Sequence, residues 1–215
     1  PCQIAIANNI RGPSLTVNTA CSSGIDAVTV ACMLIESGAA DTMVAVGGES
    51  IMCNITMASL AAAQALSKNN DDPAHACRPF DKNRDGFVMG EGGGALVLET
   101  LEHAKARGAK IYAEILGCAN NNDAFHITSP RPGGEGGALC MALALEQAGL
   151  KPEDVDYINT HGTATHMGDA YECAAIHTVF GQHAKELLIS STKSATGHLM
   201  GAGGITETIA CIQAI

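Results

Sequence analysis

One cysteine and two histidines stand in sequence contexts that suit nucleophilic catalysis. Cys21 lies in segment 18–24, His161 in segment 159–165 and His198 at the end of segment 193–198. In each case a run of apolar or β-branched residues gives way to small and hydroxylated residues, which is typical of a strand that ends in a functional turn. The three segments therefore predict a catalytic site.

Cys21 is the candidate nucleophile. It lies between a predicted strand at 14–19 and a predicted helix at 22–37, so we expect its sulfur at a helix N-terminus. There the helix dipole and the free N–H groups favour the thiolate, which is the nucleophilic form. Burial statistics alone favour a structural thiol, but the position and the neighbours of Cys21 point to catalysis.

The two histidines have matching surroundings. His161 precedes small and hydroxylated residues at 162–165, where a ligand can approach the backbone and form hydrogen bonds with hydroxyl groups. His198 follows Thr196 and Gly197 and precedes a glycine-rich helix start. Either histidine alone is typical of an ordinary polar loop, whereas the pair indicates a shared function.

Other site motifs are incomplete. The chain has no Cys-x-x-Cys or His-Glu-x-x-His motif, and segment 81–86 resembles the opening of a calcium loop whose twelfth position is Gly92 instead of an acid. The glycine run at 90–95 imitates a dinucleotide fingerprint, but it precedes a predicted strand where a helix should begin. We predict no metal and no bound cofactor.

Composition narrows the class of protein. The 215 residues are 47% hydrophobic and carry a formal net charge of -10, which disfavours nucleic acid or an anionic membrane as the partner. Apolar stretches are interrupted before the roughly 18 residues that a membrane helix requires, and no signal peptide opens the chain. Nine evenly spread cysteines predict reduced thiols. We expect a cytoplasmic protein.

The pattern of apolar residues, glycines and turns predicts alternating strands and helices. Strands are expected at 14–19, 42–46, 95–99, 111–116, 155–159 and 187–190. Helices are expected at 22–37, 56–66, 101–107, 138–148, 168–180 and 205–215. The alternation indicates an α/β architecture with a mixed or parallel sheet covered on both faces, and strands 95–99 and 111–116 are candidates for its centre. Because Pro1 replaces an initiator Met and Ile215 ends an uncapped helical run, we interpret the chain as a fragment.

Four motifs, in order, resemble the signatures of the β-ketoacyl-ACP synthases over essentially the whole chain. The closest resemblance is to the synthase II type, with polyketide ketosynthases as near relatives. The motifs are Asn18 to Gly24, Arg78 to Asp81 with Arg84 to Phe87, His161 to Thr165 with Gly168 and Asp169, and Lys193 to His198.

The resemblance implies a fold and an activity. The fold is thiolase-like, with α-β-α-β-α layers in two similar halves, here residues 1–109 and 110–215, truncated at both ends. The activity is decarboxylative Claisen condensation of an acyl thioester with malonyl-ACP in fatty-acid elongation, by a cytoplasmic homodimer whose partner is acyl carrier protein. The substrates travel on the phosphopantetheine arm of that carrier. A missing C-terminal segment would carry one oxyanion-hole donor, so the chain alone is expected to be inactive.

The same resemblance assigns roles to the main candidates. Cys21 would carry the growing acyl chain as a thioester, while His161 and His198 would hold the malonyl thioester carbonyl and stabilise the enolate. Lys193 would keep the electrostatic field near the two histidines positive, and Glu172 would orient the network that these residues form. A purely structural salt bridge is an equally good interpretation of the last two residues.

Substrate binding is assigned to five further residues. Thr163 and Thr165 match positions that hydrogen-bond the phosphopantetheine arm, and Thr128 is another substrate-binding candidate. Leu60 and Met57 are candidates for lining the acyl pocket, with core packing as the alternative.

Two alternatives to the fatty-acid enzyme stay open. One is the ketosynthase domain of a polyketide synthase. The other is a non-catalytic partner subunit resembling a chain-length factor, against which the intact Cys21 argues. A thiolase or a type III synthase would need a second cysteine, or an Asn in place of one histidine.

Overall fold

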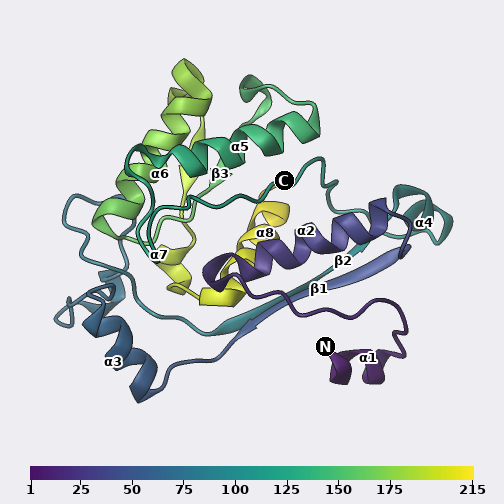
Figure 1. The fold of residues 1–215 in the computed structure, drawn as a ribbon, viewed down its shortest axis with the longest axis horizontal. Coiled ribbons are helices and arrows are strands. Elements are labelled where there is room, and N and C mark those ends of the chain that lie inside the picture. Colours follow the sequence, from purple (N-terminus) through teal and green to yellow (C-terminus); the bar gives the residue numbers. More distant parts are fainter. The chain divides into compact units, whose positions relative to one another are not determined.

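The structure is a computed structural model that describes residues 1–215, which form helices and short strands (Figure 1). The chain divides into two units. Unit 1 contains Pro1–Ser50, Glu91–Glu114 and Leu199–Ile215, and unit 2 contains Ile51–Gly90 and Ile115–His198. Each unit therefore joins segments that are far apart in the sequence. No helix in either unit is both long enough and apolar enough to cross a bilayer.

An antiparallel ribbon forms the sheet of unit 1. Strand β1 (Thr42–Glu49) pairs with β2 (Gly92–Glu99), so that Thr42 lies opposite Glu99 and Glu49 opposite Gly92. Helices α2 (Ser23–Glu36) and α8 (Gly203–Ala214) contact this ribbon. The core between them consists of Val28, Ala31, Ala45, Leu98 and Ile205. Complete burial of a Val, Leu or Ile side chain contributes about 1.5–3 kcal/mol.

Helices α2 and α8 approach each other closely at Gly24. A Cβ atom at this position would lie 2.6 Å from the backbone nitrogen of Ile205 and 3.1 Å from the carbonyl oxygen of Gly201. Because neither backbone atom can move freely, only glycine fits. The close contact fixes the N-terminal end of α2, which is the end that follows Cys21.

The other elements of unit 1 are short. They are α1 (Cys2–Asn8), the 3-10 helix η1 (Ala20–Ser22), α4 (Leu101–Ala106) and the 3-10 helix η6 (Met200–Ala202). The Thr100 side chain caps α4, because its hydroxyl oxygen accepts the backbone N–H of His103 at 3.2 Å.

Two helices cover a short parallel pair of strands in unit 2. Strand β3 (Tyr157–Asn159) pairs in parallel with β4 (Leu188–Ser190). Helix α6 (His166–Phe180) packs against α5 (Glu135–Ala148). Their core is built on Ile176, Phe180 and Leu187. The remaining elements are α3 (Asn54–Ala62), α7 (Lys193–Thr196), and the 3-10 helices η2 (Pro73–His75), η3 (Pro132–Gly134), η4 (Pro152–Asp154) and η5 (Gly181–Lys185).

The predicted strands at 14–19 and 111–116 are wrong, and so is the interpretation of 95–99 and 111–116 as a sheet centre. Both segments lack regular secondary structure, and β2 pairs only with β1. A strand requires a hydrogen-bonded neighbour, which apolar and β-branched residues alone do not provide. The sheet is two separate ribbons, one antiparallel and one parallel. Both units take residues from each side of position 109, so the division into halves 1–109 and 110–215 stays a prediction.

Candidate active site

Cys21 lies in a strained turn at the start of α2. It is the middle residue of η1, and the residue before it, Ala20, has a positive φ of 53°. Such a backbone conformation is costly for a residue other than glycine and persists only where the surrounding structure holds it. The Cys21 side chain is half-buried, and its thiol contacts the Met200 thioether with 4.0 Å between the sulfur atoms.

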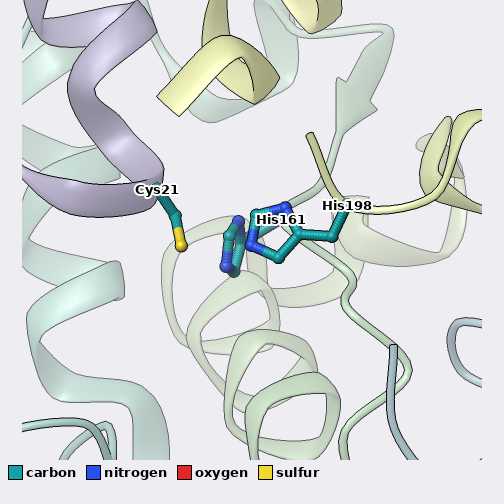
Figure 2. A group of neighbouring side chains, drawn as sticks. All are labelled: Cys21, His161 and His198. Carbon is teal, nitrogen blue, oxygen red and sulfur yellow. The ribbon is translucent and has the colours of Figure 1, made fainter. Parts of the chain in front are cut away.

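The helix that follows Cys21 favours its ionised form. Helix α2 is 14 residues long, so the partial positive charge at its N-terminus is well developed, and Cys21 immediately precedes that end (Figure 2). A nearby positive dipole stabilises a thiolate relative to a thiol. The nucleophilic role predicted for Cys21 is therefore consistent with its local structure.

In unit 2, His161 is held by its backbone at the end of β3. The backbone N–H groups of His161 and Gly162 donate to the two carboxylate oxygens of Glu172, at 2.6 and 2.7 Å. Gly162 has a φ of 35°, and a Cβ there would lie 2.7 Å from the Cβ of Ser191. The turn is thus fixed by a side chain of α6 and by tight packing, and the predicted role of Glu172 in orienting the catalytic network stays a prediction.

Backbone hydrogen bonds also fix His198. Its N–H donates to the Val88 carbonyl at 2.7 Å, and its carbonyl accepts the N–H of Gly90 at 2.9 Å. The imidazole is only 2% exposed, and the Phe87 ring lies edge-on to it with 5.1 Å between the ring centroids. Segment 87–90, which the sequence did not connect with His198, therefore positions this side chain.

The two imidazoles lie next to each other. Their ring centroids are 5.3 Å apart and their planes are inclined by 85° (Figure 2). Burial, followed by the charge of Lys193, lowers the pKa of His198 to about 4. Burial, Lys193 and His198, in that order, lower the pKa of His161 to about 3, although part of the His161 side chain is open to solvent. Both rings are neutral at pH 7, and each has one N–H to donate.

Lys193 and Glu172 act on the same part of unit 2. Lys193 is 1% exposed, and its positive charge lowers the pKa values of both histidines. Burial raises the pKa of Glu172, while the two backbone hydrogen bonds and the Lys193 charge oppose that rise. The two groups interact electrostatically within the histidine cluster, and their catalytic roles stay predictions.

Comparison with known families identifies the chain. A model described as the N-terminal domain of β-ketoacyl synthases matches residues 1–104, and a model of the C-terminal domain matches residues 112–215. The chain belongs to the β-ketoacyl synthase family. The resemblance inferred from the four motifs is thereby confirmed.

Curated relatives of this ketosynthase chain are 3-oxoacyl-[acyl-carrier-protein] synthases 2. The protein from Rhizobium meliloti is 53% identical over 99% of the chain, and the one from Vibrio cholerae is 47% identical over 99% of it. The chain covers 51% of each relative. It thus spans about half the length of the curated relatives it matches.

Solved ketosynthase structures have the same fold over the length of the chain. A β-ketoacyl synthase from Burkholderia phymatum gives a TM-score of 0.93 at 40% identity, covering 99% of this chain and 50% of that one. A type II polyketide ketosynthase, in complex with its acyl-carrier protein and bound to the hexaketide, gives 0.95 at 38% identity. The chain is covered completely in that match, which spans 53% of the polyketide ketosynthase.

An ion pair that the sequence did not predict supports the loop at 161–165 of the ketosynthase chain, which carries His161 and is called the histidine loop below. The buried Asp169 carboxylate accepts the N–H of Phe80 at 2.7 Å and forms an ion pair with the Arg84 guanidinium at 3.4 Å. Arg84 also donates to the backbone carbonyls of Thr165 and His166, at 3.1 and 2.6 Å. The two family motifs around Arg84 and Asp169 are therefore joined directly, a contact that spans more than 80 residues of sequence and has no local signal.

The candidate threonines differ in exposure. Thr163 is buried, and its hydroxyl oxygen lies 3.0 Å from that of Thr165. Thr128 is exposed in the loop before α5, where its backbone N–H donates to the His126 ring. Thr163 and Thr165 follow His161 in the same loop, and the substrate-binding role of Thr163, Thr165 and Thr128 stays a prediction.

The proposed pocket residues lie on α3 in unit 2. Leu60 is half-buried and Met57 is 41% exposed. Their exposure leaves apolar surface for a ligand to contact, and their role in acyl binding stays a prediction.

The glycine run at 90–95 opens strand β2, as expected, and not a helix. The expectation of a site without a metal also stays a prediction.

Proposed function

We propose that the complete protein catalyses decarboxylative Claisen condensation of an acyl thioester with malonyl-ACP, through an acyl-Cys21 intermediate, in fatty-acid elongation. The observation that carries this proposal is the adjacent pair of imidazoles, His161 and His198, in a chain of the β-ketoacyl synthase family; burial lowers the pKa of both rings, so that they are neutral at pH 7. Two neutral N–H donors suit an enolate that develops negative charge. Protonated imidazoles would donate a proton instead and quench it.

Acyl transfer to Cys21 is the first step. The Cys21 thiolate attacks the thioester carbonyl of acyl-ACP, a new carbon–sulfur bond forms, and the phosphopantetheine thiolate leaves and takes up a proton. The dipole of α2 supports this step by favouring the thiolate. The covalent intermediate divides one difficult carbon–carbon bond formation into two easier reactions.

Decarboxylation of the malonyl thioester is the second step. The bond between the α-carbon and the carboxylate breaks, carbon dioxide leaves, and the electron pair moves into an enolate. His161 and His198 donate hydrogen bonds to the enolate oxygen. A comparable oxyanion-hole donor is worth about 3 kcal/mol, so two donors give this step a substantial share of its rate.

Condensation is the third step. The enolate carbon attacks the acyl-Cys21 carbonyl, and collapse of the tetrahedral intermediate expels the Cys21 thiolate and leaves a 3-oxoacyl-ACP. The step requires the Cys21 sulfur and the two imidazoles to face one substrate, which is part of the proposal. Burial and, to a lesser extent, the Lys193 charge lower the pKa values of both rings and keep them neutral, and Glu172 holds the His161 loop.

The family also supports a proposed assembly. The complete protein would have a thiolase-like fold with α-β-α-β-α layers, form a homodimer in the cytoplasm, and receive its substrates from acyl carrier protein. The polyketide ketosynthase that resembles this chain was solved with its own acyl-carrier protein, which supports the choice of partner. Thr163, Thr165 and Thr128 are proposed to contact the phosphopantetheine arm, with Leu60 and Met57 in the acyl pocket. The chain on its own is expected to be inactive.

A polyketide ketosynthase is the second candidate. The 0.95 TM-score to such an enzyme favours it, whereas the 53% identity to a synthase 2 favours fatty-acid elongation over the 38% identity to the polyketide enzyme. A chain-length-factor-like subunit is disfavoured because Cys21 is present. We therefore assign the fatty-acid reaction.

The decisive experiment measures malonyl-ACP decarboxylation and condensation by the full-length gene product. Substituting Cys21→Ala should abolish condensation but leave decarboxylation, whereas His161→Ala and His198→Ala should lower decarboxylation by about a hundredfold each. Cys53→Ser, which changes an exposed thiol on another loop, is the matched control for the cysteine variant.

Each outcome has a clear meaning. Retained condensation in the Cys21→Ala protein would refute the covalent mechanism. Equal decarboxylation in the two histidine variants and the wild type would refute the enolate role. Products of one acyl length extended by two carbons support fatty-acid elongation, whereas repeatedly extended, unreduced chains support the polyketide alternative.

A further inference from the structure

Helix α2 carries a buried carboxylate one turn after Cys21. Asp26 is 5% exposed and lies in the first turn of the helix, whose other buried residues are Gly24, Val28 and Ala31. Burial of an ionised carboxylate is expensive unless hydrogen bonds satisfy it. The hydrogen bonds that satisfy Asp26 are therefore important for the start of the helix.

The hydrogen bonds of Asp26 go to both sides of Cys21. Its Oδ2 atom accepts the Thr19 hydroxyl, and the Ser22 hydroxyl lies 3.1 Å from the same oxygen and 2.9 Å from the Thr19 carbonyl, between which it shares its proton. Thr19 and Ser22 are the residues that flank the Ala20–Cys21 pair. One carboxylate oxygen thus joins the two ends of the turn that presents the thiol.

Further hydrogen bonds close the same turn. The Thr19 N–H donates to the Ser23 hydroxyl at 2.9 Å, and that hydroxyl donates to the Ala20 carbonyl at 2.7 Å. Ala20 has the positive φ of 53°, which the turn must enforce against its own preference. Of these partners only Asp26 is a charged group, and hydrogen bonds to charged groups are the strong ones.

We propose that Asp26 is a positioning residue which, through Thr19 and Ser22, holds the turn that places Cys21 for attack on an acyl thioester. The inference rests on the proposed function of Cys21 as the acylated nucleophile. In this role Asp26 acts through Thr19 and Ser22. It keeps the Cys21 sulfur and backbone N–H in the geometry that the tetrahedral intermediate requires, where small misplacements are costly.

The test compares two reactions of Cys21 in the full-length protein. Self-acylation by an acyl-ACP thioester depends on the position of Cys21, whereas alkylation by iodoacetamide needs only an accessible thiolate. Both rates are measured by intact-protein mass spectrometry on Thr19→Val, Thr19→Ser and Asp26→Asn. The control is Thr29→Val, which removes a hydroxyl bonded to the Ile25 carbonyl on the same helix.

We expect Thr19→Val and Asp26→Asn to slow acylation by at least about tenfold while alkylation changes by less than about threefold. Thr19→Ser, which restores the hydroxyl, and Thr29→Val should both acylate close to the wild-type rate. Thr19 has an exposed side chain, so its variants keep the test valid even if Asp26→Asn does not fold.

Two other results would overturn the inference. It fails if Thr19→Val acylates as fast as the wild type, or if acylation and alkylation fall together in Thr19→Val. A wild-type protein that is alkylated but never acylated would instead refute the proposed function of Cys21, and the positioning role with it.

Discussion

The neutrality of His198 gives a quantitative prediction about the pH dependence of stability. Burial and Lys193 lower its pKa from 6.5 to about 4 in the folded protein. At pH values between about 4 and 6.5, His198 binds a proton in the unfolded chain but not in the folded chain. Stability from this residue is therefore complete above pH 6.5 and is lost as the pH falls towards 4.

The size of the effect follows from the two pKa values. Each pKa unit is worth about 1.4 kcal/mol, and lowering the pH from 7.5 to 5 should cost the folded state about 2 kcal/mol through His198. The side chain is only 2% exposed, so solvent screening reduces this figure little. Replacement by a side chain that does not titrate removes this contribution.

Urea unfolding of the full-length protein at pH 7.5 and pH 5, followed by circular dichroism, measures the difference. Between the two pH values, the wild type should lose about 2 kcal/mol more free energy of unfolding than His198→Gln. His177→Gln, which removes an exposed imidazole from α6, controls for the loss of a histidine. Equal losses in the wild type and His198→Gln would show that His198 is not kept neutral by burial.

Three further predictions concern the support of the histidine loop. Gly162→Ala should lower the free energy of unfolding by about 3 kcal/mol in urea titrations, because its Cβ would lie 2.7 Å from Ser191 at a φ of 35°. Glu172→Gln should cost about 2 kcal/mol in the same assay, since an amide NH₂ would face a backbone N–H, and should slow decarboxylation as well. Lys193→Met should raise the pKa of His161, measured by NMR titration of the imidazole, because the Lys193 charge lowers that pKa; an unchanged pKa would contradict the assigned cause.

Local sequence patterns predicted the elements that local interactions determine. Helix α5 ends at Ala148 because Gly149 adopts a left-handed conformation with a φ of 68°, and the Gly149 position alone indicated this end. Segment 14–19 has the residues of a strand but no hydrogen-bonded neighbour. Strand formation depends on a partner that the segment itself does not specify.

The same contrast holds for the site. Cys21, His161 and His198 were predicted from the turns that carry them. The supports of those turns were not, because they come from distant segments, such as Val88 for His198, or from a polar residue within an apolar helix pattern, such as Asp26. In the second case a signal did exist: an Asp at a position of α2 that faces the core needs a partner.

Main-chain hydrogen bonds hold the backbone at the two histidines, so the positions of residues 161 and 198 do not depend on which side chains they carry. Glu172 binds main-chain N–H groups of the His161 turn, and main-chain bonds to Val88 and Gly90 hold residue 198. None of these bonds uses an imidazole atom. The scaffold therefore specifies two places for a hydrogen-bond donor and leaves the kind of donor to the side chain alone, so that one codon change at either place can alter the chemistry without rebuilding the loop.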